Sequence, residues 1–359
     1  MESKNLPSFC WPYVDWVEYA SDNAVKVMTL YIILLIASIP GSTLNLLILA
    51  TIWRRSSLQT PSNLFLCNLA LSDFIVGVVS LPLAISWKYV EIFGKNKEVL
   101  CSVGLTAFAL SSVFAGISIL TVTAATVDRY LALYLHLSYP AKVTTKRVAV
   151  GCLLMWATSL VTALVVFTGF ANFNYLTIVI LPLCTQVSAV SFYKIFKVIK
   201  HHHTQISSLS AQFQASSTLP SMLRYRRSVM SLVYVQILLI ISCLPFTCTM
   251  IVYQVKGPSV NVLLAWNIGT FFVYLASSLN PVLYCWRIRE VRNAVWDTVR
   301  LWASRTRHRL LGIEGAVSDQ SGGTTLNNTR GTATVIRVKE SRVNNGVIEA
   351  SHWNNSCLR

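Results

Sequence analysis

An acid and an arginine stand side by side at the end of a long uncharged stretch. Residues 99–127 carry no charge, and Asp128 and Arg129 follow them directly. A charge near hydrocarbon is costly unless it is paired or reaches water, so ionisable residues in such places are candidate functional residues. The pair could simply anchor a helix at a membrane interface. Alternatively, the carboxylate holds the guanidinium until helices move and free it for another partner.

A second acid, Asp73, lies inside another apolar stretch, in the sequence LALSDF. It could be an ion or proton site, a partner in a switch, or a polar side chain that pairs with a neighbouring helix for packing alone. Ser118, Ser277 and Asn280 lie in other apolar stretches and are candidate partners, because polar groups inside membrane helices usually face the bundle.

Residues typical of metal-dependent or nucleophilic catalysis do not form a pattern here. The nine cysteines are scattered without a CxxC pair, which argues against a zinc module or a disulfide framework. The three histidines at 201–203 have no nearby acids or thiols to complete a metal site. We therefore expect no metal site and no enzyme activity.

The elements that position these residues are predicted to be membrane helices. The chain is 54% hydrophobic and 12% charged, whereas soluble domains carry roughly 25% charge. A span needs about 20 apolar residues, and a break at residues 169–174 divides one overlong run in two. The uncharged runs are 27–53, 56–87 (interrupted by Asp73), 99–127, 148–193, 228–255 and 257–286. The predicted fold is an all-α membrane protein, a bundle of seven transmembrane helices.

The basic residues predict the orientation. With the N-terminus outside, six of the thirty lysines and arginines lie on the outer side and twenty-four on the inner side, as the positive-inside rule requires. This asymmetry explains the net charge of +16 without nucleic acid as a partner. A transporter is disfavoured, because only Asp73 is ionisable within the span cores and no inverted repeat is apparent. We expect a plasma-membrane protein with a cytoplasmic C-terminus.

The polar motifs stand in the order, and on the spans, of a known family. Over roughly residues 25–300 the chain resembles the rhodopsin-like (class A) G-protein-coupled receptors. Its short loop between the fourth and fifth spans is similar to that of the melanocortin, cannabinoid and lysophospholipid receptors. The matching residues are Asn45, Asp73, Asp128-Arg129-Tyr130, Trp156, Tyr193, Pro245 and Asn280-Pro281-Val-Leu-Tyr284.

The resemblance implies a receptor that couples to a heterotrimeric G protein. Asp128 would hold Arg129 at rest, and the inner end of the sixth helix would swing about Pro245 on activation. Arg129 would then face the tail of a Gα subunit, steadied by Tyr193 and Tyr284. The other residues implied at this surface are Tyr130, Leu137, Asn280 and Pro281.

The resemblance also implies an allosteric sodium site made by Asp73, Ser118, Ser277 and Asn280. No other cofactor is expected. Retinal in particular is excluded, because Tyr274 stands where opsins carry the retinal lysine and the seventh span contains no lysine.

Three departures from the family pattern change these expectations. Cys243 replaces the usual tryptophan near the Pro245 hinge, so we expect activation gating to differ from the family's. Tyr225 replaces an acid that would lock Arg129, which predicts raised basal activity. The short loop lacks the family's usual cysteine, which leaves two alternatives for Cys10 and Cys101: a bridge to each other, or two free thiols. A receptor-shaped scaffold or decoy that does not signal stays the main alternative function.

The resemblance places a ligand pocket at the outer end, with no acid or base among its residues. A cationic amine would lack its counter-ion there, so we expect a neutral or lipid-like ligand. The predicted pocket residues are Ser111, Ser112, Thr177, Phe246, Met250, Thr270 and Tyr274.

The chain is predicted to divide into four segments. Residues 1–27 form an extracellular N-terminus, 28–286 the receptor domain, 287–303 an amphipathic eighth helix on inner-leaflet lipids, and 304–359 a disordered cytoplasmic tail. Serine and threonine hydroxyls in that tail could be phosphorylated by a receptor kinase and then dock arrestin; a spacer is the alternative.

Overall fold

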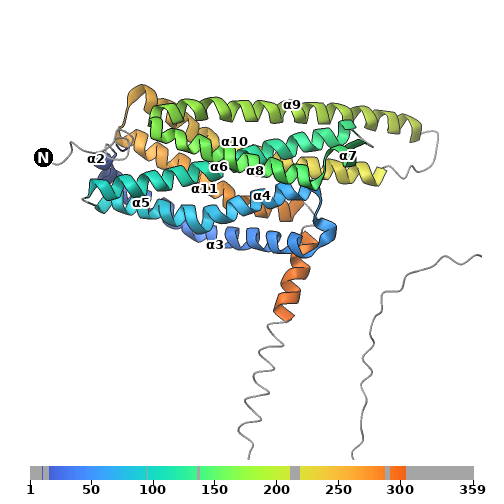
Figure 1. The fold of residues 1–359 in the computed structure, drawn as a ribbon, viewed down its shortest axis with the longest axis horizontal. Coiled ribbons are helices and arrows are strands. Elements are labelled where there is room, and N and C mark those ends of the chain that lie inside the picture. The colour runs from blue at the N-terminus through green and yellow to red at the C-terminus, as the bar shows by residue number, and fades with distance from the viewer. Residues whose placement is uncertain are drawn as a thin grey trace, which may run out of the picture. The chain divides into compact units, whose positions relative to one another are not determined.

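The computed structural model describes residue 10 and residues 16–94, 96–135, 138–210, 219–287 and 292–304, without the side chains of 201–228, 231 and 287. Leu137, the side chain of Tyr225 and the predicted tail lie outside these residues, so their roles stay predictions. Figure 1 shows long helices lying side by side along the bundle.

The predicted seven spans are confirmed: the described residues include seven helices long and apolar enough to cross a membrane. The short α2 (Val17–Ala20) leads into the first span, and α7 (Tyr139–Lys142) follows the third. A π-helical turn, Val76–Ser80, separates the two halves of the second span. In chain order the spans are α3 (Ala24–Arg54), α4 with α5 (Pro61–Ile75 and Leu81–Phe93), α6 (Lys97–Leu135), α8 (Thr145–Leu164), α9 (Phe170–Ser210), α10 (Leu219–Lys256) and α11 (Val260–Arg287).

Local sequence signals begin and separate these helices. The Thr60 hydroxyl accepts a hydrogen bond from the backbone N–H of Asn63 at 3.3 Å, and Pro61 is the first residue of α4. Both features are typical of a helix start. Gly169 has φ of 137° and joins the fourth span to α9. The predicted break at 169–174 was too long, because α9 already begins at Phe170. Only Gly169, whose positive φ favours glycine, separates it from the 3-10 turn Val165–Thr168.

Many apolar side chains lie on the outside of the bundle and many polar side chains on the inside, as expected of a membrane protein. Large aliphatic residues such as Ile36, Leu153 and Val161 are exposed on the outside of the bundle, whereas Asn45 and Asp73 are buried inside it. Lipid hydrocarbon solvates the aliphatic surface, and polar groups find partners only between helices.

Residues 292–304 are helical, which overlaps the predicted eighth helix 287–303 and extends one residue into the predicted tail. We call the end of the bundle that holds Arg55 and Arg129, predicted to be cytoplasmic, the inner end, and the opposite end the outer end. Arg55 pairs with Asp297 at 2.9 Å, and the Thr51 hydroxyl donates to the Thr298 hydroxyl at 3.1 Å. Val295 is buried in a cluster of apolar residues that includes Ile48, Leu239 and Tyr284, here called the inner apolar cluster. These contacts attach the eighth helix to the inner end of the first span.

Candidate functional site

The inner end of α6 holds a carboxylate with partners from three elements. Arg129 Nη2 lies 3.4 Å from Asp128 Oδ2. The Ser62 hydroxyl of α4 donates to the same oxygen at 3.0 Å, and the Tyr139 hydroxyl of α7 donates to Oδ1 at 2.7 Å. The sequence predicted Arg129 as the partner of Asp128 but not Ser62 or Tyr139, because these two donors reach Asp128 only through the packing of α4 and α7 against α6.

The Tyr139 phenol stays a hydrogen-bond donor at neutral pH. Partial burial, and then the hydrogen bond to Asp128, raise the pKa of Tyr139 to about 12. The phenol therefore holds the second carboxylate oxygen while Arg129 and Ser62 hold the first.

The structure brings Tyr284 near Arg129 and leaves Tyr193 apart. Arg129 and Tyr284 line one small cavity of about 60 Å³, together with Leu232 of α10. Tyr193 is 68% exposed on α9, and Tyr130 stacks on Tyr134 with ring centroids 5.9 Å apart. An arginine held by its neighbouring acid, with Tyr193 exposed, is the arrangement that the sequence resemblance predicts for the resting state.

Asp73 is buried inside the bundle, and one of its carboxylate oxygens accepts a hydrogen bond. Asn280 Nδ2 of α11 donates to its Oδ2 at 2.9 Å, and Ser277 contacts the same carboxylate. Ser118 lies beside Ser72, with the two hydroxyls 3.3 Å apart. Within the described part of the chain, Asp73 Oδ1 has no hydrogen-bond partner. A buried carboxylate oxygen without a hydrogen-bond partner, on a carboxylate that Ser277 contacts, fits a hard cation, which prefers oxygen ligands.

A tryptophan of the fourth span holds three helices together. Trp156 Nε1 donates to Asn68 Oδ1 at 2.9 Å, and Asn68 Nδ2 donates to the Thr121 hydroxyl at 2.7 Å. The motif predicted the position of Trp156 on α8. It did not predict that the indole would satisfy an amide of α4.

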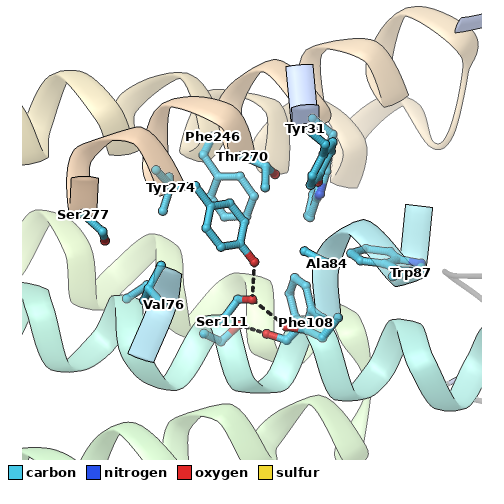
Figure 2. A pocket seen from close by; sticks show the side chains of 15 residues that line it. Tyr31, Val76, Ala84, Trp87, Phe108, Ser111, Phe246, Thr270, Tyr274 and Ser277 are labelled. Atoms are coloured by element: carbon cyan, nitrogen blue, oxygen red, sulfur yellow. Dashed lines mark hydrogen bonds between the residues drawn. The ribbon is translucent and has the colours of Figure 1, made fainter. Parts of the chain in front are cut away.

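A cavity of about 90 Å³ lies between the outer halves of the helices. The Ser111 and Tyr274 hydroxyls, 2.6 Å apart, join α6 to α11 across it (Figure 2). None of the described lining residues is acidic or basic. Five of the seven predicted pocket residues line this cavity: Ser111, Ser112, Phe246, Thr270 and Tyr274.

The other two predicted pocket residues do not line it. The Thr177 hydroxyl donates to the backbone carbonyl of Phe173 at 2.9 Å, and Met250 is fully buried in an aromatic cluster beyond the cavity. Counting along the chain placed them on the inward side of α9 and α10. It missed the rings of Phe108 and Trp266, which line the cavity. Phe108 packs against Phe173 of α9, and Trp266 packs against Phe246 of α10.

The predicted hinge lies in α10. The Thr249 hydroxyl donates to the carbonyl of Pro245 at 2.9 Å. Cys243 packs against the inner apolar cluster that contains Leu239 and Tyr284, and it does not appear among the described residues lining the outer cavity. The residue that replaces the family's tryptophan therefore contacts the inner half of the bundle.

Comparisons with known proteins agree with this geometry. Residues 44–284 match the family described as "7 transmembrane receptor (rhodopsin family)". The histamine H2 receptor of Cavia porcellus is 22% identical over 318 residues, 80% of this chain and 81% of that protein. G-protein coupled receptor 3 of Homo sapiens is 26% identical over 277 residues, 74% of this chain and 80% of that protein. Squid rhodopsin superposes with a TM-score of 0.64 at 19% identity, over 77% of this chain and 86% of its own, which shows the fold alone.

Proposed function

Because the chain belongs to the rhodopsin family of seven-transmembrane receptors, we propose that it converts ligand binding at the outer cavity into nucleotide exchange on a heterotrimeric G protein. The observation that carries this proposal is the polar group at the inner end of α6. There Arg129 Nη2 lies 3.4 Å from Asp128 Oδ2, and Arg129 lines a cavity together with Tyr284. The outer cavity lies in the same bundle, between the same helices α6 and α11.

The coupling is an equilibrium between two packings of the helices. At rest, Arg129, Ser62 and Tyr139 share the Asp128 carboxylate. In the active packing the inner end of α10 moves away about Pro245, and Arg129 faces the Gα subunit. A ligand shifts this equilibrium only by binding one packing more tightly than the other.

A sodium ion is the proposed allosteric partner of the resting packing. Asp73 Oδ1 would hold it, with the hydroxyls of Ser118 and Ser277 close by and Asn280 holding the other carboxylate oxygen. The ion would supply a positive charge at the centre of the bundle and so favour the packing in which these groups stay together.

The outer cavity suits a neutral ligand. Its described lining offers hydroxyls and rings but no carboxylate, and a buried ammonium ion without a counter-ion is unfavourable. A volume of about 90 Å³ is also well below the roughly 300–1,000 Å³ of ordinary ligand pockets. A ligand that fills an ordinary pocket of roughly 300–1,000 Å³ therefore requires the outer end of the bundle to open.

The cellular setting follows from the same proposal. The protein would lie in the plasma membrane with its N-terminus outside, so that the basic inner residues face anionic lipids. Arrestin and a receptor kinase would act on the tail, residues 304–359.

The deciding experiment is GTPγS loading of a panel of Gα subunits on membranes that carry the protein, without ligand. Arg129→Ala should reduce loading to background, because it removes the group that faces the G protein. Arg147→Ala is the matched control, since that arginine bonds only a nearby carbonyl on the same side and should leave loading unchanged.

Background loading in the wild-type and in both variants would contradict basal signalling. A ligand screen that also produced no loading would then favour the decoy over the receptor.

A further inference from the structure

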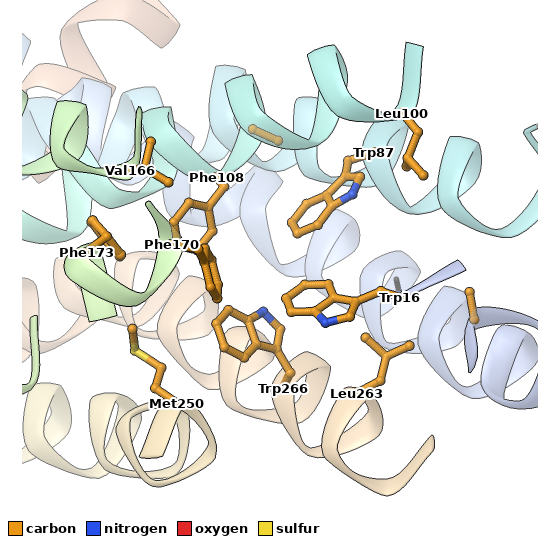
Figure 3. Close-up of a cluster of buried hydrophobic side chains, with 12 residues drawn as sticks. Trp16, Trp87, Leu100, Phe108, Val166, Phe170, Phe173, Met250, Leu263 and Trp266 are labelled. Atoms are coloured by element: carbon orange, nitrogen blue, oxygen red, sulfur yellow. The ribbon is translucent and has the colours of Figure 1, made fainter. Parts of the chain in front are cut away.

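The outer end of the bundle is closed by a residue of the N-terminal segment. Trp16 directly precedes α2 and is 2% exposed. Its indole contacts four aromatic rings, and Figure 3 shows it between Trp87 and Trp266. The ring centroids lie 6.0 Å away for Trp87, 6.2 Å for Phe170, 5.8 Å for Tyr253 and 4.9 Å for Trp266.

These four rings come from four different spans. Trp87 belongs to α5, Phe170 to α9, Tyr253 to α10 and Trp266 to α11. A single indole thus touches the outer ends of the second, fifth, sixth and seventh spans. Aromatic pairs of this kind stabilise a cluster beyond the effect of the area they bury.

A buried charge completes the surroundings of the indole. Lys88 Nζ lies 4.0 Å from the centroid of Trp87 and 5.6 Å from that of Trp16. Glu91 neutralises the ammonium group at 2.5 Å, and both side chains are buried. A cation beside electron-rich ring faces favours indole over a saturated ring of similar size.

The indole is held by a covalent tether as well as by contacts. Cys10 and Cys101, the pair left open by the sequence, are joined by a disulfide with Cα atoms 5.2 Å apart. The tether links the N-terminal segment to the outer end of α6, a few residues before Trp16 in the chain. It keeps Trp16 close to its binding place whenever the contacts break.

Trp16 covers the cavity of the proposed ligand. Trp87, Phe108 and Trp266 line that cavity and also belong to the cluster that surrounds Trp16. Trp16 also packs with Leu263, which lies one helical turn outward of Trp266 on α11 (Figure 3). The indole therefore sits on the outer side of the rings whose inner sides face the cavity.

We propose that the place of Trp16 is a binding site for a planar, electron-rich aromatic group, and that Trp16 is its built-in occupant. A ligand with such a ring enters by replacing the indole, and the opened space joins the cavity below. The proposal names the ligand class of the proposed receptor. Its test uses thermal unfolding, so it stands or falls independently of G-protein coupling.

The first test is rescue by free indole. In the purified full-length protein, Trp16→Ala should lower the Tm by roughly 5 °C or more through the space it leaves. Millimolar indole should restore most of that loss, as small aromatics fill engineered apolar cavities. Cyclohexanol at equal concentration should restore little. Trp53→Ala, which removes an 84% exposed tryptophan, should change neither the Tm nor the response to indole.

The second test separates a replaceable occupant from an ordinary core residue. Cutting the tether with Cys10→Ser and Cys101→Ser leaves Trp16 in the chain but lowers its local concentration at the site. Indole should then raise the Tm of the tether-free protein more than that of the wild type, and less than that of Trp16→Ala. Equal indole shifts in all three proteins would overturn the proposal.

A failure to fold does not remove the test. If Trp16→Ala yields no folded protein, expression in medium with indole should recover folded protein at the membrane, and cyclohexanol should not. No recovery with either compound would count against an indole site.

Discussion

The two ends of the bundle are built in opposite ways. The outer end is a cluster of large rings from separate helices around Trp16, closed by one disulfide and holding a small, uncharged cavity. The inner end has an adjacent acid and arginine in one short segment, where Asp128 and Arg129 meet Ser62 and Tyr139. The outer end therefore depends on packing across many helices, and the inner end on a local polar motif that can exchange partners.

The largest expected effect tests the outer end. Glu91→Ala leaves the Lys88 ammonium buried without its carboxylate, and breaking one half of a buried pair costs about 3–5 kcal/mol. We expect a large fall in Tm of the purified protein. Glu98→Ala, an exposed acid nearby, should leave the Tm unchanged. A small shift for Glu91→Ala would mean that the outer end tolerates a free charge and is not tightly packed.

The second largest expected effect tests Asp73, which lies between the two ends of the bundle. Replacing choline chloride by sodium chloride should lower basal GTPγS loading of the wild type by roughly fivefold or more, the usual size of an allosteric coupling. In Asp73→Asn the neutral amide cannot hold the ion, and the salt should make no difference. Equal sodium sensitivity in both proteins would contradict a sodium site at Asp73.

The smallest effect tests the inner end. Tyr139→Phe removes one donor to Asp128 and keeps the ring. Basal loading should rise about two- to fivefold, because a partly exposed hydrogen bond contributes about 0.5–1 kcal/mol net. Tyr134→Phe, an exposed tyrosine on α6, is the control. Unchanged loading would show that Tyr139 does not restrain the resting packing.

The contribution of Tyr139 to stability should also have a defined pH range. The pKa of its phenol rises from the ordinary 10.0 to about 12 in the fold, so the folded state favours the protonated form. That stabilisation is complete below pH 10 and is lost as the pH rises from there through about 12. The Tm difference between wild type and Tyr139→Phe should therefore stay constant from neutral pH to about pH 9.

Prediction from the sequence succeeded where a signal is local. The uncharged runs set the seven spans, and the motifs located Asp128, Arg129, Asp73 and Asn280 on them. It failed for Thr177 and Met250, because the count of residues along α9 and α10 says nothing about which rings of other helices fill the space beside them. The partners Ser62 and Tyr139 carry no motif either.

Hydrocarbon thickness and the cost of charge in lipid act on each segment separately, so the sequence by itself determined the spans and the polar residues inside them. The tertiary structure alone decided that Trp16 would reach the rings of four spans and that Cys10 would meet Cys101. Such contacts depend on the relative positions of helices far apart in the chain. Those positions follow from the packing of all side chains together, which no local pattern records.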